Sequence, residues 1–127
     1  MSIEGEELLQ LTISAALEIK PDTLVILDLR GISSFTERFL LLSAPSQRQV
    51  HALADRIEER LRSKKVRSHH REGYNEAKWI LLDYGDLVVH IFDGETRDYY
   101  DLERLWRDAP QIRMIPPEVQ PSGQEAT

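Results

Sequence analysis

Aspartates and histidines are the residues of this 127-residue chain whose chemistry is worth testing first. Asp83 and Asp86 are three residues apart across a turn, and Asp28 is alone on its predicted strand. Nucleotidyl transfer needs two carboxylates at alternate positions of one strand, where both reach the same metal pair. That pair is missing, although a Gly-Ser turn (residues 31–34) follows a strand as such a site requires. A nucleotidyltransferase-like enzyme therefore stays an alternative and not the main interpretation.

The histidines do not form a metal site. His69 and His70 are adjacent and face opposite sides of an extended chain, while His51 and His90 lie on other predicted elements. Zinc normally takes three or four ligands, and the chain has no cysteine. We predict no metal, no cofactor and no catalytic residue, and for His90 we favour a packed imidazole with one hydrogen-bonded ring nitrogen.

The stretch WILLDYGDLVVHIF (79–92) predicts a β-hairpin that turns at Tyr84-Gly85-Asp86. Side chains alternate along a strand, so Trp79, Leu81 and Asp83 share one face, and helices are expected to cover the other. A Trp at a strand start is either core or an interface anchor. An aromatic, an aliphatic and an acid on a stiff scaffold, with no nucleophile beside them, favour binding over catalysis.

Composition limits the classes of protein and partner. The length suits one domain, the absence of cysteine fits a reducing compartment, and no apolar run is long enough for a membrane span. The start, MSIEGEELLQ, is acidic and unlike a signal peptide, so we expect a cytoplasmic protein without membrane contact. A net charge of −6 favours a basic protein partner over general nucleic-acid binding.

A basic run from Arg60 to Arg71 qualifies this acidity. Such a run usually marks a solvated helix end, where cations complement the helix dipole. The alternative is a phosphate contact with RNA through Lys64, Lys65 and Arg67. Asp28 and Arg30 point to the same side of their strand and predict a structural ion pair, and we read Arg48 as a solvated charge.

Hydrophobic periodicity and turn residues predict an α/β domain with one sheet and flanking helices. Ser46 is a good helix N-cap with Gln49 three residues later. After Ala109, Pro and polar residues predict a flexible tail (110–127) behind a single domain (1–109). The expected elements are a helix at 6–19, strands at 23–30 and 39–44, a helix from 46 to about 62, an edge strand at 66–72, the 79–92 hairpin and a helix at 98–108.

Four segments, in order, resemble the ribosomal silencing factor family, also called the Iojap-related family. They are LDLRGISSFTERF (27–39), SQRQVHALADRI (46–57), EGYNEAKWILLDYGDLVVHIF (72–92) and RDYYDLERLW (97–106), and the likeness covers about residues 8 to 109. The combination is specific, although no single segment is decisive. Glu37-Arg38 and Ala44-Pro45 depart from residues that the family commonly carries there.

The resemblance implies a mixed-sheet α/β domain, similar to a nucleotidyltransferase fold without its catalytic residues. It implies no enzyme, but a translation repressor that binds the large ribosomal subunit through its fourteenth protein. Bound there, family members sterically block joining of the small subunit when nutrients are short. Carried over by position, the partner-binding residues are Trp79, Leu81, Asp83, Tyr84, Gly85 and Asp86. An RNA-binding ribosome assembly factor is a further alternative, and an exposed Trp79 face is also able to form a homodimer when the protein is free.

Overall fold

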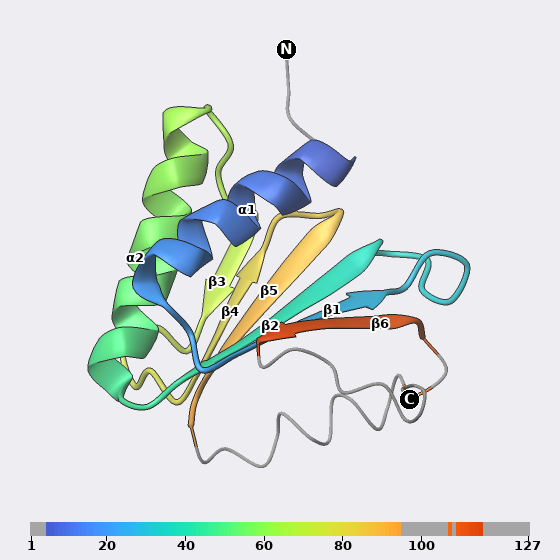
Figure 1. The fold of residues 1–127 in the computed structure, drawn as a ribbon. Coiled ribbons are helices and arrows are strands. Elements are labelled where there is room, and N and C mark those ends of the chain that lie inside the picture. The colour runs from blue at the N-terminus through green and yellow to red at the C-terminus, as the bar shows by residue number, and fades with distance from the viewer. Residues whose placement is uncertain (1–4, 95–106, 108, 116–127) are drawn as a thin grey trace.

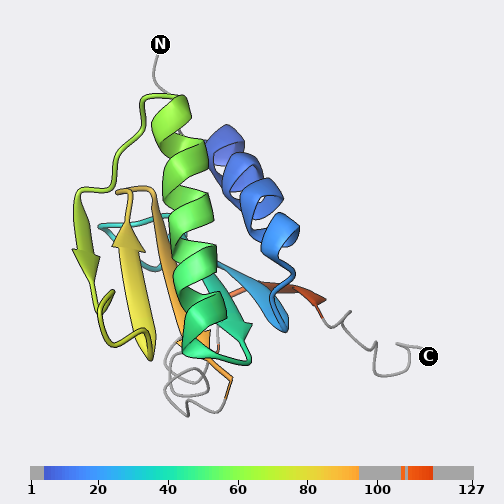
Figure 2. The same cartoon turned by 90° about the vertical axis from the view of Figure 1, so that its left-hand side faces the viewer.

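The computed structural model describes residues 5–94, 107 and 109–115, and it contains one six-stranded sheet with two helices on the same face (Figure 1). Figure 2 shows the two helices side by side across that face. The elements in chain order are α1 (Gly5–Ile19), β1 (Thr23–Asp28), β2 (Arg38–Ala44), α2 (Gln47–Ser63), β3 (His70–Glu72), β4 (Trp79–Asp83), β5 (Leu87–Asp93) and β6 (Gln111–Ile115).

The sheet has the order β3-β4-β5-β2-β1-β6 and is mixed. Neighbouring strands are antiparallel except β2 and β5, which run parallel in the middle of the sheet. A parallel pair needs a long crossover, and here α2, β3 and β4 lie between the two strands in the chain. The predicted α/β class with a single mixed sheet is therefore confirmed.

Both faces of the central strands are buried, which explains their unbroken apolar runs. Leu24 and Ile26 of β1 belong to the core beneath the helices, whereas Val25 and Leu27 belong to a second apolar cluster on the opposite face. All four side chains are at most 6 % exposed. Position along a strand thus decides the face on which a side chain lies. The same alternation places the candidate functional residues of β4 on the opposite face from their buried neighbours.

Local hydrogen bonds delimit α2 at both ends. The Ser46 hydroxyl accepts from the Gln49 backbone N–H at 3.2 Å, which confirms the predicted N-cap. At the other end Lys65 adopts a positive φ of 65°, its N–H donates to Arg62, and the Val66 N–H donates to Leu61. This pair of bonds is a Schellman motif, which satisfies carbonyl groups that a helix end would otherwise leave open.

The C-terminal prediction was wrong for residues 111–115, which form β6 where we expected a flexible tail. β6 pairs antiparallel with β1, and the Pro110 carbonyl accepts from the Asp28 N–H at 2.9 Å. The prolines flank the QIRMI segment and do not interrupt it, so its N–H groups remain available for a ladder. The helix expected at 98–108 and Trp106 fall outside the described residues. Neither described helix has the length and hydropathy to cross a membrane.

Candidate functional site

The turn between β4 and β5 is shaped by its own side chains. The Asp83 carboxylate accepts from the Gly85 backbone N–H at 2.8 Å, and the Tyr84 N–H donates to the Leu87 carbonyl at 2.8 Å. Gly85 has a φ of 87°, a conformation that glycine adopts at little cost. The hairpin prediction is confirmed, and Asp83 has a structural task in it that the sequence reasoning missed: it caps the turn in the manner of an Asx residue.

The two faces of β4 differ as alternation predicts. Trp79, Leu81 and Asp83 are each partly exposed, whereas Ile80 and Leu82 are fully buried against the helix side. Trp79 and Leu81 pack with their inner parts against the second apolar cluster. We call the surface of Trp79, Leu81 and Asp83, together with Gly85 and Asp86 of the turn, the hairpin face.

Tyr84 does not lie on the hairpin face, although we had grouped it with the contact residues. It is 6 % exposed and belongs to the core beneath the helices. Burial raises the pKa of its hydroxyl above the ordinary value of 10.0. Tyr84 follows Asp83 in the chain and so points to the opposite side, where it anchors the turn to the core.

Trp79 is held by a hydrogen bond to His90 on the neighbouring strand. Its indole N–H donates to His90 Nδ1 at 3.0 Å, and its ring lies 5.2 Å from the ring of Phe92, centroid to centroid. The bond requires the His90 tautomer with its hydrogen on Nε2. Trp79 therefore combines both sequence interpretations, since it packs against the second apolar cluster and is still partly exposed as a residue.

His90 is a packed imidazole, as predicted from its place in an apolar strand. It is 3 % exposed, and the Phe39 ring meets it edge-on with centroids 4.5 Å apart. Its Nε2 has no hydrogen-bond partner among the residues that the structure describes. Burial lowers the pKa of His90 from 6.5 to about 4, because a charged imidazolium is poorly solvated there. At neutral pH the side chain is thus an uncharged acceptor for Trp79.

The loop before β4 presses closely on the strand, a feature that sequence reasoning did not find. A Cβ built on Gly73 would lie 2.1 Å from the Trp79 carbonyl oxygen, and the φ of Gly73 is 78°. At the loop's end the Lys78 carbonyl accepts from the Asp93 N–H at 3.1 Å. The Gly in EGYN was the one available signal, since glycine marks close backbone approaches. These contacts set where Trp79 enters the sheet.

The two aspartates considered for nucleotidyl transfer lie on opposite faces of the sheet. Asp28 shares the helix side with Ile26, whereas Asp83 shares the other side with Leu81. Asp28 lies on β1 and Asp83 lies on β4, and the strands β5 and β2 lie between these two. At the usual strand spacing the two aspartates are therefore about 14 Å apart across the sheet. Metal pairs that act on phosphates are about 4 Å apart. The two carboxylates therefore have no common metal position, and the described residues contain no group of three or more potential metal ligands placed to hold an ion.

Asp28 forms the ion pair with Arg30 that its spacing predicted. The Arg30 Nε and Nη2 atoms donate to the two carboxylate oxygens at 2.9 and 2.6 Å. The guanidinium lowers the pKa of Asp28 from 3.8 to about 2, chiefly through these hydrogen bonds. Arg48 is exposed, as expected of a solvated charge.

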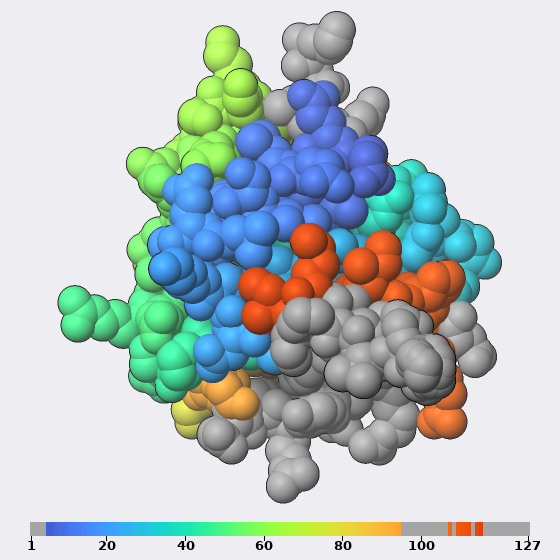
Figure 3. Space-filling model, in the orientation of Figure 1, coloured from blue at the N-terminus to red at the C-terminus, as the bar shows by residue number. Residues whose placement is uncertain are grey.

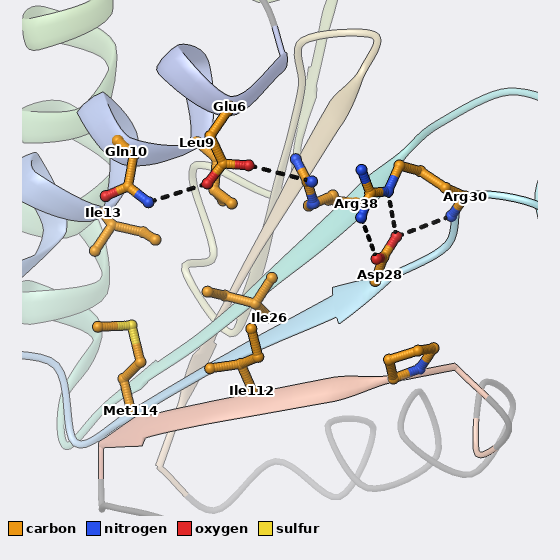
Figure 4. Close-up of a pocket in the computed structure, with 11 residues that line it drawn as sticks. Glu6, Leu9, Gln10, Ile13, Ile26, Asp28, Arg30, Arg38, Ile112 and Met114 are labelled. Carbon is orange, nitrogen blue, oxygen red and sulfur yellow. Dashed lines mark hydrogen bonds and ion pairs between the residues drawn. The ribbon is translucent and has the colours of Figure 1, made fainter.

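A groove of about 430 Å³ runs between α1 and β6 (Figures 3 and 4). Apolar side chains line its middle, among them Ile26 of β1 and Ile112 of β6. Ion pairs close one end, where Glu6 meets Arg38 at 3.2 Å and Asp28 meets Arg30. These charges are paired, and the described residues that line the groove include no nucleophile, so they offer an apolar surface.

The basic run divides into paired and unpaired cations. Arg60 contacts Glu18 on α1, and Arg71 contacts Glu58 at 3.0 Å. Lys64, Lys65 and Arg67 are exposed and form no ion pair within the described part of the chain. Lys64 and Lys65 directly follow the last residue of α2, Ser63, which agrees with the simpler interpretation of this run as a helix terminus.

Comparison with known proteins gives a consistent result. The family model described as "Ribosomal silencing factor during starvation" matches residues 2–127, beyond the point where we had placed the end of the resemblance. The ribosomal silencing factor RsfS of Halalkalibacterium halodurans is 38% identical over 112 residues, which is 88% of this chain and 96% of that protein.

Two further relatives extend the comparison. A crystal structure of a Bacillus halodurans protein superposes with a TM-score of 0.78 at 37% identity, covering 85% of this chain and 98% of that one. A mouse protein named "Mitochondrial assembly of ribosomal large subunit protein 1" is 33% identical over 75 residues, 57% of this chain and 33% of its own length. The chain therefore belongs to the ribosomal silencing factor family, whose role is the regulation of translation.

Proposed function

We propose that this protein binds the large ribosomal subunit through its fourteenth protein and blocks joining of the small subunit. The hairpin face would be the contact surface, and the rest of the domain would be the obstacle. The action is steric and needs no catalytic residue, so we propose a repressor of translation under nutrient limitation that works in the cytoplasm, not an enzyme. Membership of the family supports the class of function, and the hairpin face supports the position of the contact.

One observation carries the choice of surface: Trp79 is both partly exposed and fixed. A tryptophan that is already held by His90 and Phe92 loses little rotamer freedom on binding. Trp is also enriched among the interface residues whose truncation costs most affinity. Leu81 adds apolar area beside Trp79, and the two residues lie on the strand that leads into the turn.

The charge on this face suits a basic ribosomal protein. Asp83 and Asp86 are partly exposed carboxylates, and the whole chain carries a net charge of −6. Complementary potential raises the association rate and disfavours partners of the same sign. Tyr84 is assigned a supporting role, because it is buried beneath the turn.

The test is co-sedimentation of the protein with isolated large subunits, followed by addition of small subunits. We expect Asp86→Lys to weaken binding at least tenfold, because it places a cation in the contact surface. Glu7→Lys is the matched control: it changes the net charge equally, but lies exposed on α1 at the helix side of the sheet. Trp79→Ala is expected to lose binding, with thermal melting used to check that it folds.

Two quantities are measured: binding to the large subunit and, after small subunits are added, the yield of joined ribosomes. Wild-type protein that co-sediments and lowers the yield of joined ribosomes supports the proposal, provided that Asp86→Lys loses both effects and Glu7→Lys keeps them. Equal binding by wild type and both hairpin-face variants would refute the proposed surface. Binding without any decrease in joined ribosomes would refute steric blocking and favour a ribosome assembly role. Sedimentation of the protein by itself also reports whether the hairpin face forms a homodimer.

A peripheral RNA contact has one observation in its favour. Lys64, Lys65 and Arg67 are exposed cations without an ion-pair partner among the described residues. Each phosphate contact steepens the dependence of affinity on salt. If these residues touch ribosomal RNA, the Lys64→Gln, Lys65→Gln double variant will bind large subunits with a shallower salt slope than wild type. An unchanged slope would leave the run with its helix-terminal role only.

A further inference from the structure

The loop between β1 and β2 presents two large apolar side chains to solvent. Phe35 is 72 % exposed and Ile32 is 46 % exposed, three residues apart in the segment RGISSFTE (30–37). Single exposed apolar residues are normal on a protein surface, whereas apolar residues that form a contiguous exposed patch mark interaction sites. We call residues 29–37 the β1–β2 loop.

Hydrogen bonds hold this loop in place at both ends. The N–H groups of Ile32 and Ser33 both donate to the Leu29 carbonyl at 2.9 Å, and Leu29 itself is fully buried. The Phe35 N–H donates to the Ser33 hydroxyl at 3.2 Å, and Thr36 is 6 % exposed. A loop fixed in this way displays Phe35 with little ordering left to occur on binding.

The β1–β2 loop is joined to the hairpin face. The backbone N–H groups of Glu37 and Arg38 both donate to the Asp86 carbonyl at 3.1 Å. A hollow of about 340 Å³ lies at this junction, and its lining includes Phe35, Glu37 and Asp86. A partner that covers the turn of the hairpin face thus meets the loop directly beside it.

The charge available in the hollow is negative. Glu37 and Asp86 form no ion pair within the described part of the chain. Arg30 also lines the hollow, but both oxygens of Asp28 already accept from its guanidinium group. Glu37 does act on Arg30 through its charge, but neither acid forms an ion pair with it. An aromatic ring next to these two carboxylates suits a lysine or arginine side chain, which pairs with the acids and lies over the ring.

We propose that the β1–β2 loop is a second contact area for the same basic protein of the large subunit. Phe35 and Ile32 would be covered by the partner, and a lysine or arginine of the partner would enter the hollow between Phe35, Glu37 and Asp86. This inference rests on the proposed function and extends its contact surface beyond the positions taken from the family. The exposed Ile112 and Met114, by contrast, line the groove on the helix side and are not among the residues that line the hollow.

The test compares full-length variants for affinity to isolated large subunits. Phe35→Ser removes the most exposed apolar side chain of the loop, and Ile112→Ser is a matched control that is 59 % exposed in the α1–β6 groove. We expect Phe35→Ser to weaken binding about tenfold and Ile112→Ser to stay within twofold of wild type. Glu37→Gln is expected to reduce the salt dependence of affinity, because it removes a charge from the hollow.

Trp79→Ala separates failure of this inference from failure of the proposed function. If Trp79→Ala loses binding while Phe35→Ser stays within twofold of wild type, the loop is not a contact and the proposed function stands. If wild type does not bind, or if neither variant alters its affinity, both proposals fail. If Phe35→Ser shifts a monomer–dimer equilibrium and leaves subunit affinity unchanged, the loop contacts a second copy of this chain and the inference is wrong.

Discussion

Acid should destabilise this protein through His90, and the variant His90→Leu isolates that effect. The imidazole is 3 % exposed and accepts from the Trp79 indole N–H through Nδ1, and within the described part of the chain its Nε2 has no partner. Leucine has a similar volume and places no polar atom in this position. At pH 7.5 the variant loses the hydrogen bond from Trp79, which destabilises it, and it also loses the buried unpaired Nε2–H group, which stabilises it. These effects oppose one another, so we expect the free energy of unfolding to change by no more than about 1 kcal/mol.

The sign of the effect follows from the direction of the pKa shift. Burial lowers the pKa of His90 in the folded protein to about 4, below the ordinary value of 6.5. Between these values the unfolded chain binds a proton that the folded protein does not, so stability falls as the pH falls. Each unit of pH in this window costs the wild type about 1.4 kcal/mol, which amounts to roughly 3 kcal/mol between pH 6.5 and 4.5.

Urea unfolding of both proteins at pH 7.5 and pH 4.5, followed by circular dichroism, measures the difference. All other titrating groups are shared, so they cancel to first order when the two proteins are compared at each pH. We expect His90→Leu to gain about 3 kcal/mol over wild type on acidification. Parallel stability curves for the two proteins would refute the reasoning, since they would mean that His90 is protonated as easily when folded as when unfolded.

Two further substitutions test the backbone contacts that position the site. Gly73→Ala should lower the free energy of unfolding by more than about 3 kcal/mol, because its Cβ meets the Trp79 carbonyl oxygen at 2.1 Å. Gly31→Ala is the control, with a φ of 83° but open space, and should cost about 1–2 kcal/mol; equal losses would contradict the clash. Ser46→Ala should cost about 1 kcal/mol in urea unfolding through loss of the α2 N-cap, and no loss would exclude the capping role.

Local patterns were enough to predict the elements that carry the site. Alternation placed Trp79, Leu81 and Asp83 on one face of a strand, and the structure keeps them together. Gly85 marked the turn because its φ of 87° is one that other residues rarely adopt. Ser46 marked the start of α2 by its ability to accept a backbone hydrogen bond. Each of these features depends on residues close in the chain.

Features that depend on distant residues were not predicted. β6 pairs with β1 from more than eighty positions away, and the composition of the C-terminal region hides that strand among prolines. The bond from Trp79 to His90 needs the register of β4 against β5, in which Trp79 is opposite Phe92. The contact of Gly73 with the Trp79 backbone likewise appears only when the loop is folded onto the strand. Tertiary pairing supplies this information, and sequence periodicity does not.

The position of β4 in the sheet explains why mutations at Trp79 must be interpreted with care. β5 pairs with the whole of β4, and β3 pairs with its second half from Leu81 to Asp83, so most of the hairpin face lies on an inner strand and not on a sheet edge. Rigidity favours binding because little freedom remains to be lost. The same packing gives Trp79 a share in stability, since Phe92 and His90 both contact its ring. Loss of binding in Trp79→Ala therefore has two explanations. Phe35 is exposed and Asp86 is partly exposed, and neither belongs to the two apolar clusters, so Asp86→Lys and Phe35→Ser report on the interface itself.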